Sequence, residues 1–296
     1  MTKTAMITIC GRPNVGKSTL TNALVGEKIA IVSPKPQTTR SRITAIVSHG
    51  DTQFVLLDTP GFHKPRTRLG DYMVNVVRES VADVDCVLLL VEPIPSVGPQ
   101  EEALIERLRQ ARVPALLVIN KIDTVDKAGL LAVMAVYAAA FDFDAILPVS
   151  AKTGDGLDEL LAEMEKYAAE GPHLFPDDMI TDQPERQICA ELVREKLLRC
   201  LDREIPHGTA VEVTKFSERE NGIVDLEVTI FCEKESHKGI IIGKKGAMLK
   251  KIGKLARHDI EDFLGTKVNL QTWVKVKENW RDSMASLRNF GYSDQS

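Results

Sequence analysis

Short apolar runs alternate with longer amphipathic stretches up to about residue 169 of this 296-residue chain. The short runs have the length and continuous apolar character of buried strands, and the longer stretches repeat apolar residues with a helical period. Strands are expected at residues 5–10, 54–58, 87–91, 115–119 and 145–149, and helices at 99–112 and 157–167. This alternation predicts a mostly parallel sheet with helices on both faces.

One pair of strands departs from the alternation. Residues 43–49 are followed by a Gly50–Asp51 turn and then by the apolar residues 53–58. Strands joined by so short a turn can pair only in the antiparallel sense. The predicted sheet is therefore mixed rather than wholly parallel.

The periodicity stops between residues 170 and 185, where glycine and proline residues interrupt the chain. We interpret residues 173–184 as a linker. After it the expected order is a helix at 185–201, strands at 209–215 and 222–232, two helices around 243–246 and a strand at 267–277. The pattern predicts an α/β domain in residues 1–172 and an α+β domain in residues 185–296, which includes a C-terminal tail.

Charge is distributed unevenly between these regions. The whole chain carries a formal net charge of −4, but residues 234–281 hold twelve Lys and Arg against five Asp and Glu. This segment is therefore +7 and the remainder is −11. A basic module of this kind is a candidate for binding a polyanion.

Composition narrows the class of protein. With 44% hydrophobic and 27% charged residues, the chain is typical of a globular protein and unlike a disordered one. The five cysteines are widely spaced without a CxxC pair, which favours a reducing, cytoplasmic location over a disulfide framework or a zinc site. The longest apolar run, residues 128–141, is shorter than the roughly 18 residues that a membrane-spanning helix needs.

Residues 11–18 read Gly-Arg-Pro-Asn-Val-Gly-Lys-Ser and match the phosphate-binding pattern GxxxxGK[ST]. The motif lies after an apolar strand and before a helix, which is the context that it requires. Its backbone N–H groups and the helix N-terminus bind phosphate, Lys17 reaches the β- and γ-phosphates, and Ser18 binds Mg²⁺. The residues expected to contact the phosphates are Gly11, Asn14, Val15, Gly16, Lys17, Ser18 and Thr19.

Asp58 and Gly61, in the sequence Asp-Thr-Pro-Gly, follow the strand at 54–58. At the carboxyl edge of the sheet Asp58 can hold Mg²⁺ through water, and the Gly61 N–H can bind the γ-phosphate. The loop at 33–40 supplies a threonine to complete the Mg²⁺ shell. Thr39 is the first candidate, and Thr38 remains the alternative.

Asn120, Lys121 and Asp123 follow the strand at 115–119 in the sequence Asn-Lys-Ile-Asp. A carboxylate at Asp123 can accept from both N1–H and the 2-amino group of guanine, whereas adenine would leave it unpaired. Asn120 ties the base edge to the loop, and the Lys121 stem covers the base. The sequence Ser150-Ala151-Lys152 follows the last strand and offers a backbone N–H to the guanine carbonyl. Together these motifs specify GTP over ATP.

Phe62 follows Gly61, at the position where Ras-like enzymes carry the glutamine that orients water. Catalysis is therefore expected to rest on Lys17, Thr39, Gly61 and Asn14. The Asn14 side chain can help to hold a monovalent cation against the phosphates, in place of an arginine finger. The alternative, that Asn14 only caps the loop, is equally compatible with the sequence.

A second motif lies in the basic segment, where Gly243-Lys244-Lys245-Gly246 separates two helical stretches. Such a GxxG loop lets backbone N–H groups approach a single-stranded sugar-phosphate backbone, while lysines neutralise phosphates. The order of elements predicts a type II KH domain. Its expected RNA contacts are Ile242, Gly243, Lys244, Lys245, Gly246, Lys250, Lys251 and Lys254. Trp273 and Trp280 are expected to pack in the core or against another domain rather than to stack on bases.

Several of these motifs occur in one order along the chain: GRPNVGKS, PQTTR, DTPGFHKP, NKID, SAK, GIIIGKKG, WVKVKENW and LRNFGY. In that order they resemble the Era family of bacterial GTPases over essentially the whole length. The resemblance implies a P-loop GTPase with a KH domain that binds the 3′ end of 16S ribosomal RNA during 30S subunit maturation. It also implies peripheral association with the inner membrane. It places the chain among GTPases that have a hydrophobic residue in place of the catalytic glutamine, many of which use potassium. We expect the protein to be a monomer.

Two other functions remain open at this point. GTP could merely set RNA affinity, with hydrolysis incidental to a binding module. Alternatively, the chain could act in tRNA modification or large-subunit assembly, although the single phosphate loop followed by GIIIGKKG argues against both. We also expect the nucleotide to influence RNA binding, because γ-phosphate can order residues 33–40 and 58–68 and so reset a contact between domains.

Overall fold

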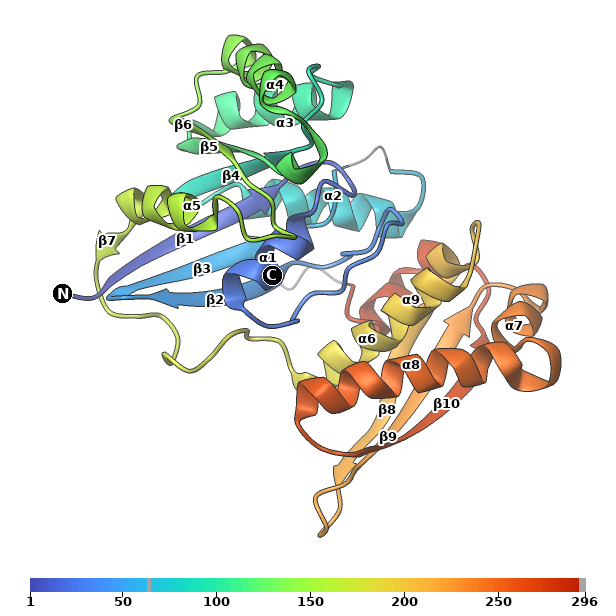
Figure 1. The fold of residues 1–296 in the computed structure, drawn as a ribbon. Coiled ribbons are helices and arrows are strands. Elements are labelled where there is room, and N and C mark those ends of the chain that lie inside the picture. Colours follow the sequence, from blue (N-terminus) through green and yellow to red (C-terminus); the bar gives the residue numbers. More distant parts are fainter. Residues whose placement is uncertain (63–64, 293–296) are drawn as a thin grey trace. The chain divides into compact units, whose positions relative to one another are not determined.

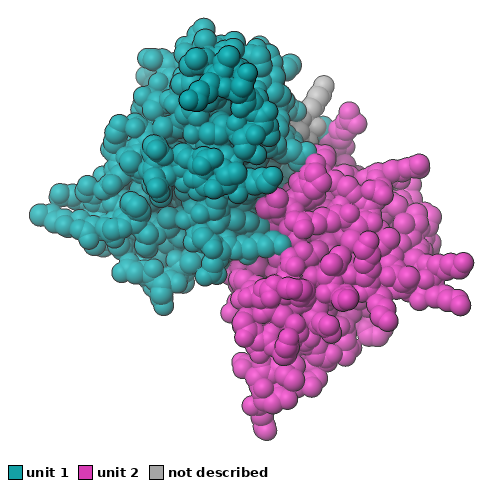
Figure 2. All heavy atoms as spheres, in the orientation of Figure 1, with its two compact units in different colours: residues 1–30, 39–65, 73–182 teal, residues 31–38, 66–72, 183–296 magenta. Residues whose placement is uncertain are grey.

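The structure is a computed structural model that describes residues 1–62 and 65–292. These residues form two compact units (Figure 2). The first comprises residues 1–30, 39–65 and 73–182, and the second comprises residues 31–38, 66–72 and 183–296. Residues 63–64 and the last four residues of the predicted tail lie outside the described part of the chain.

The first unit is built on a mixed sheet with the strand order β2-β3-β1-β4-β5-β6 (Figure 1). The strands are β1 (Lys3–Cys10), β2 (Ile43–His49), β3 (Thr52–Asp58), β4 (Cys86–Val91), β5 (Ala115–Ile119) and β6 (Ala145–Pro148), and the short β7 (Ala169–Glu170) pairs with β1. All neighbours along this order are parallel except β2 and β3, which form the expected antiparallel hairpin. The predicted mixed sheet is confirmed.

Helices connect these strands and cover the sheet. They are α1 (Lys17–Val25), α2 (Arg68–Ser80), α3 (Pro99–Ala111), α4 (Lys127–Ala140) and α5 (Leu157–Met164). Alternate residues of the buried strand β4 face two separate hydrophobic clusters, with Leu88 and Leu90 in one and Val87 and Leu89 in the other. Burial on both faces explains why β4 and β5 are continuous apolar runs.

The second unit pairs three strands with helices in the KH arrangement (Figure 1). Its elements are α6 (Glu185–Cys200), β8 (Ala210–Glu218), β9 (Val224–Cys232), α7 (Glu235–Ile242), α8 (Ala247–Leu264), β10 (Val268–Val276) and α9 (Met284–Asn289). Strand β9 is central, antiparallel to β8 and parallel to β10. The predicted type II order is confirmed, with boundaries that differ by a few residues.

The two tryptophans of this unit differ in environment. Trp280 is fully buried, and its indole N–H donates to the Gly208 carbonyl at 2.9 Å. Trp273 lies on β10 with 55% of its surface exposed, so the core position, one of the two environments expected for it, is wrong. It falls on the face of the strand opposite to the buried one, as successive residues of a strand alternate in direction.

Three segments depart from the expected division of the chain into two domains and a linker. Residues 173–182 of the predicted linker pack on the first unit, where Gln53 bonds Leu174 and Phe175 and the Ile46 N–H donates to the Ile180 carbonyl. Residues 31–38 and 66–72 belong to the second unit although both were expected in the GTPase domain. The domain limits given above stay a prediction.

Candidate functional site

The phosphate loop spans residues 11–18 between β1 and the start of α1 at Lys17. Gly16 has a φ of 102°, and a Cβ at this position would collide with the Asn120 side chain. Only glycine fits there, because a side chain would be strained by the backbone as well as blocked by its neighbour. Helix α1 begins at this loop. The first N–H groups of a helix have no partner within the helix, so here they lie where they can bind phosphate.

Lys17 and Asp58 place opposite charges in the buried floor of this loop. Burial lowers the pKa of the Lys17 ammonium, an effect that the Asp58 carboxylate partly offsets. Burial raises the pKa of the Asp58 carboxyl to about 6, against the opposing influence of Lys17 and of a hydrogen bond from Ser18. Charges held away from water are stabilised by ligands of opposite charge, so this floor suits a polyphosphate together with a cation.

Three oxygen-bearing side chains converge beside the loop. The Ser18 hydroxyl lies 2.8 Å from the Thr39 hydroxyl and donates to Asp58 Oδ2 at 2.8 Å. Among the described residues, no group bonds the buried Asp58 Oδ1. Hydroxyl and carboxylate oxygens are the ligands that Mg²⁺ prefers, so the set fits this ion.

The structure separates the two threonine candidates. The Thr39 side chain is buried and faces Ser18. The Thr38 hydroxyl instead donates to the Lys35 carbonyl at 2.7 Å. This placement supports Thr39 as the residue that senses Mg²⁺ and γ-phosphate.

The guanine motifs meet at the carboxyl edges of β5 and β6. The buried Asn120 side chain donates to the Val15 carbonyl at 2.8 Å and accepts from the Ala151 N–H at 3.0 Å. Asp123 is exposed, and its Oδ1 accepts from the Ser150 hydroxyl at 2.8 Å. Asn120 thus joins the phosphate loop to the Ser150–Lys152 loop, while Ser150 orients the Asp123 carboxylate, which is predicted to read the base.

Glu92 is a residue of this site that the sequence analysis missed. Its carboxylate accepts from Arg12 at 2.6 Å and from the Lys121 ammonium at 2.5 Å, and Lys121 also donates to the Asn14 carbonyl at 2.7 Å. Glu92 follows directly after β4. Because Asp58 and Asn120 also lie at or directly after strand ends, the same criterion could have identified it.

Gly61 and Phe62 lie against the phosphate loop. The Phe62 N–H donates to the Gly11 carbonyl at 3.1 Å, and a Cβ on Gly61 would meet the Pro13 backbone at 2.8 Å. The Phe62 ring packs beneath the Arg107 guanidinium, whose carbon lies 4.5 Å from the ring centre. Asn14 is exposed, with a positive φ of 68°.

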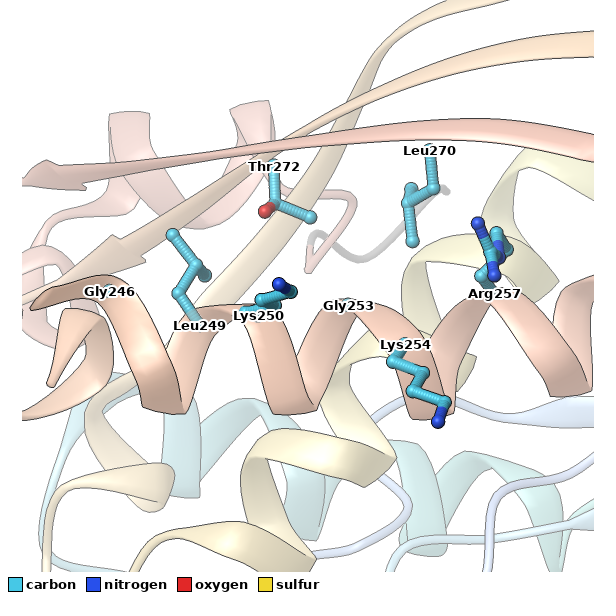
Figure 3. Close-up of a pocket in the computed structure, with 8 residues that line it drawn as sticks. All are labelled: Gly246, Leu249, Lys250, Gly253, Lys254, Arg257, Leu270 and Thr272. Carbon is cyan, nitrogen blue, oxygen red and sulfur yellow. The ribbon is translucent and has the colours of Figure 1, made fainter.

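A separate groove of about 480 Å³ lies between α8 and β10 of the second unit. Figure 3 shows Leu249 and Arg257 pointing from α8 toward β10, with Leu270 and Thr272 pointing back from the strand. Lys250 and Lys254 also line the groove. An apolar floor with cationic edges suits unstacked bases joined to phosphates.

The GxxG loop lies at the end of this groove. Gly243, Lys245 and Gly246 all have positive φ, and a Cβ on Gly243 would collide with Met248. Lys244 and Lys245 are exposed, and neither forms an ion pair with any residue that the structure describes. Of the predicted RNA contacts, Gly246, Lys250 and Lys254 line the groove, whereas Ile242, Gly243, Lys244, Lys245 and Lys251 do not.

Leu270 and Thr272 were not predicted as groove residues. They alternate along β10 with a period of two, on the side that faces α8. Their spacing predicts that they share one face of the strand, but it does not identify the helix that packs opposite that face.

Comparison with known families identifies both units. Residues 6–121 match the family described as 50S ribosome-binding GTPase, and residues 204–281 match the KH domain. The GTPase Era of Ruminiclostridium cellulolyticum is 52% identical over 290 residues, which cover 98% of this chain and 97% of that protein. The GTPase Era of Clostridioides difficile strain 630 is 51% identical over 297 residues, covering 100% of both.

Two solved structures are similar over nearly the whole chain. One is Era in complex with MgGDPNP and nucleotides 1506–1542 of 16S ribosomal RNA, with 38% identity, a TM-score of 0.94 and coverage of 99% of this chain and 100% of that one. The other is a variant of Aquifex aeolicus Era bound to GDP·AlF₄⁻, with 37% identity, a TM-score of 0.94 and coverage of 98% and 99%.

Proposed function

This chain belongs to the Era family of bacterial GTPases, and from that premise we propose that it binds the 3′ end of 16S ribosomal RNA during 30S subunit maturation, with GTP controlling RNA binding. As a member of this family, the protein is a GTPase that uses GTP and Mg²⁺. The observation that carries the proposal is the presence of both a guanine-nucleotide site and a cationic KH groove on one chain. The similar Era structure binds nucleotides 1506–1542 of that RNA together with MgGDPNP.

We assign the nucleotide contacts to the residues that the geometry gathers. Ser18, Thr39 and Asp58 are to hold Mg²⁺, which neutralises charge on the β- and γ-phosphates when bound. Lys17 is to leave its present carbonyl partners, Gly11 and Arg12, for phosphate oxygens. Asp123 reads the guanine edge, supported by Ser150.

We further propose that hydrolysis uses a monovalent cation, held by Asn14 beside the phosphates. Phe62 has no group that can orient water, and Asn14 is exposed on the loop. A cation in this place would stabilise the charge that develops during phosphoryl transfer, as an arginine finger does in other GTPases.

Hydrolysis is therefore expected to be several-fold faster in K⁺ than in Na⁺ at equal ionic strength. The measurement is phosphate release under single-turnover conditions in the two chloride salts. Asn14→Ala should lose the difference while it still binds GDP. Equal rates in both salts, with no loss in Asn14→Ala, would remove the cation from the mechanism.

GTP control of RNA binding is testable with one labelled RNA. The 16S 3′-end fragment should bind more tightly to the GDPNP-bound protein than to the GDP-bound protein at fixed salt, because linkage of ~1–3 kcal/mol corresponds to roughly 5–150-fold. Thr39→Ala should abolish the difference. A shuffled RNA of equal length is the control for sequence preference, and superimposable curves for the two nucleotide states would reduce the protein to two independent domains.

For location and assembly, we propose a cytoplasmic monomer with peripheral contact with the inner membrane, on the strength of the family resemblance. In residues 1–62 and 65–292, no helix is both long and apolar enough to cross a membrane.

A further inference from the structure

The residues that lead into Thr39 are built into the second unit. Ile31 is buried in the hydrophobic core of that unit. The Val32 N–H donates to Glu195 Oε1 at 2.9 Å, and the Val32 carbonyl accepts from Arg199 at 3.0 Å. Both backbone groups of Val32 are thus bound by side chains of α6, the first helix of the KH unit.

Arg194 of α6 holds the other end of this segment. Its side chain is fully buried and donates two hydrogen bonds to the Glu191 carboxylate, at 2.8 and 2.5 Å. The same guanidinium also donates to the carbonyl of Thr38, and its Nη1 lies 3.5 Å from the carbonyl of Gln37. Arginine suits this task because its planar fork offers five donors in fixed directions.

Fixing the Thr38 carbonyl also fixes the backbone of Thr39. The carbonyl of one residue and the N–H of the next lie in a single planar peptide unit. Thr39 follows directly, and its hydroxyl lies 2.8 Å from the Ser18 hydroxyl in the first unit. A change that shifts the N–H and Cα of Thr39 must therefore break the Arg194 bond or move α6 together with the segment.

We propose that Arg194 is a positioning residue for the nucleotide site, through which the KH unit sets the place of Thr39. This inference rests on the proposed function and specifies the path by which GTP controls RNA binding. Coupling then passes through residues 31–38 rather than through residues 173–182, which pack on the first unit. By reciprocity, RNA that stabilises one position of α6 favours one nucleotide state.

The test compares Arg194→Met with Arg186→Met in the full-length protein. Met keeps much of the side-chain length but cannot donate to the Thr38 carbonyl. Arg186 lies on the same helix and donates to the Val213 carbonyl at 2.7 Å, away from residues 31–38. In Arg194→Met, affinity for GDPNP with Mg²⁺ should fall about tenfold, equivalent to ~1.4 kcal/mol, while GDP affinity changes less than about twofold. Arg186→Met should retain both affinities.

Two further readouts separate positioning from general loss of stability. The Mg²⁺ concentration needed for half-maximal GDPNP binding should rise in Arg194→Met, and Arg194→Lys, which keeps a single charged donor, should give an intermediate ratio of GDPNP to GDP affinity. If Arg194→Met does not fold, Arg194→Lys decides alone. A ratio equal to that of the unmodified protein would overturn the inference.

These nucleotide measurements need no RNA, so they can fail or succeed independently of the proposed RNA target. If the 16S fragment binds as proposed, the difference in its affinity for the GDPNP and GDP forms should also disappear in Arg194→Met. A variant that keeps this difference while its GDPNP affinity falls would refute the coupling route and leave the proposed function standing.

Discussion

Replacing Asp123 with asparagine is expected to transfer nucleotide preference from GTP to XTP. The asparagine amide donates where the carboxylate accepts, so it suits the 2-carbonyl of xanthine and faces the 2-amino group of guanine with an N–H. Each good bidentate pair is worth ~1–3 kcal/mol of discrimination, and the reversal both removes the favourable pair and creates an unfavourable one. We therefore expect GTP affinity to fall by roughly a hundredfold or more, with XTP the better ligand.

The measurement is competition of GTP and XTP for the same site, with bound nucleotide quantified by fluorescence of a labelled analogue. Asp126→Asn is the matched control. Asp126 lies three residues away and caps α4 by accepting from the Gly129 N–H at 2.8 Å, a role that asparagine fills equally well. This control should keep GTP preference. An Asp123→Asn protein that still prefers GTP would show that the guanine site lies elsewhere.

The second large effect is expected in RNA binding, from Lys244→Asp combined with Lys245→Asp. Both lysines are exposed in the GxxG loop, and the double change replaces two cations with two anions beside phosphates. Affinity should fall about tenfold or more. The slope of log affinity against log salt should flatten by roughly 1.4, because each phosphate contact on a single strand contributes about 0.7.

Titration of a labelled single-stranded RNA at several salt concentrations measures both quantities. Lys127→Asp combined with Lys166→Asp makes the same change in net charge on exposed residues of the first unit, and it should leave RNA affinity nearly unchanged. GTP binding should survive in both double variants. If the loop variant binds RNA as the unmodified protein does, the GxxG loop is not the RNA contact.

The sequence was sufficient for those parts of the molecule in which local chemistry determines local structure. The buried strands β4 and β5 are continuous apolar runs, and Gly50 and Asp51 close a short turn between two strands. The phosphate loop could be recognised from its glycines. Position 16 requires glycine because its φ is positive and because a Cβ would collide with the Asn120 side chain. Asp58, Asn120 and Ser150 could be placed near one another because parallel strands end at one edge of a sheet.

Features that depend on contacts distant in sequence could not be predicted. Nothing in residues 31–38 indicates that α6, more than 150 positions later, holds their carbonyls. The exposure of Trp273 could not be predicted, because an aromatic residue on a strand gives no sign of which face is covered. Leu270 and Thr272 share a face by alternation, but the groove exists only because α8 lies opposite.

The most direct test of the central claim is crosslinking of the protein to RNA in growing cells, followed by sequencing of the bound fragments. We expect enrichment of the 3′ end of 16S ribosomal RNA, with crosslinks at the α8–β10 groove and loss of the signal in the Lys244→Asp, Lys245→Asp variant. Enrichment of 23S ribosomal RNA or transfer RNA, or a signal that the variant retains, would contradict it.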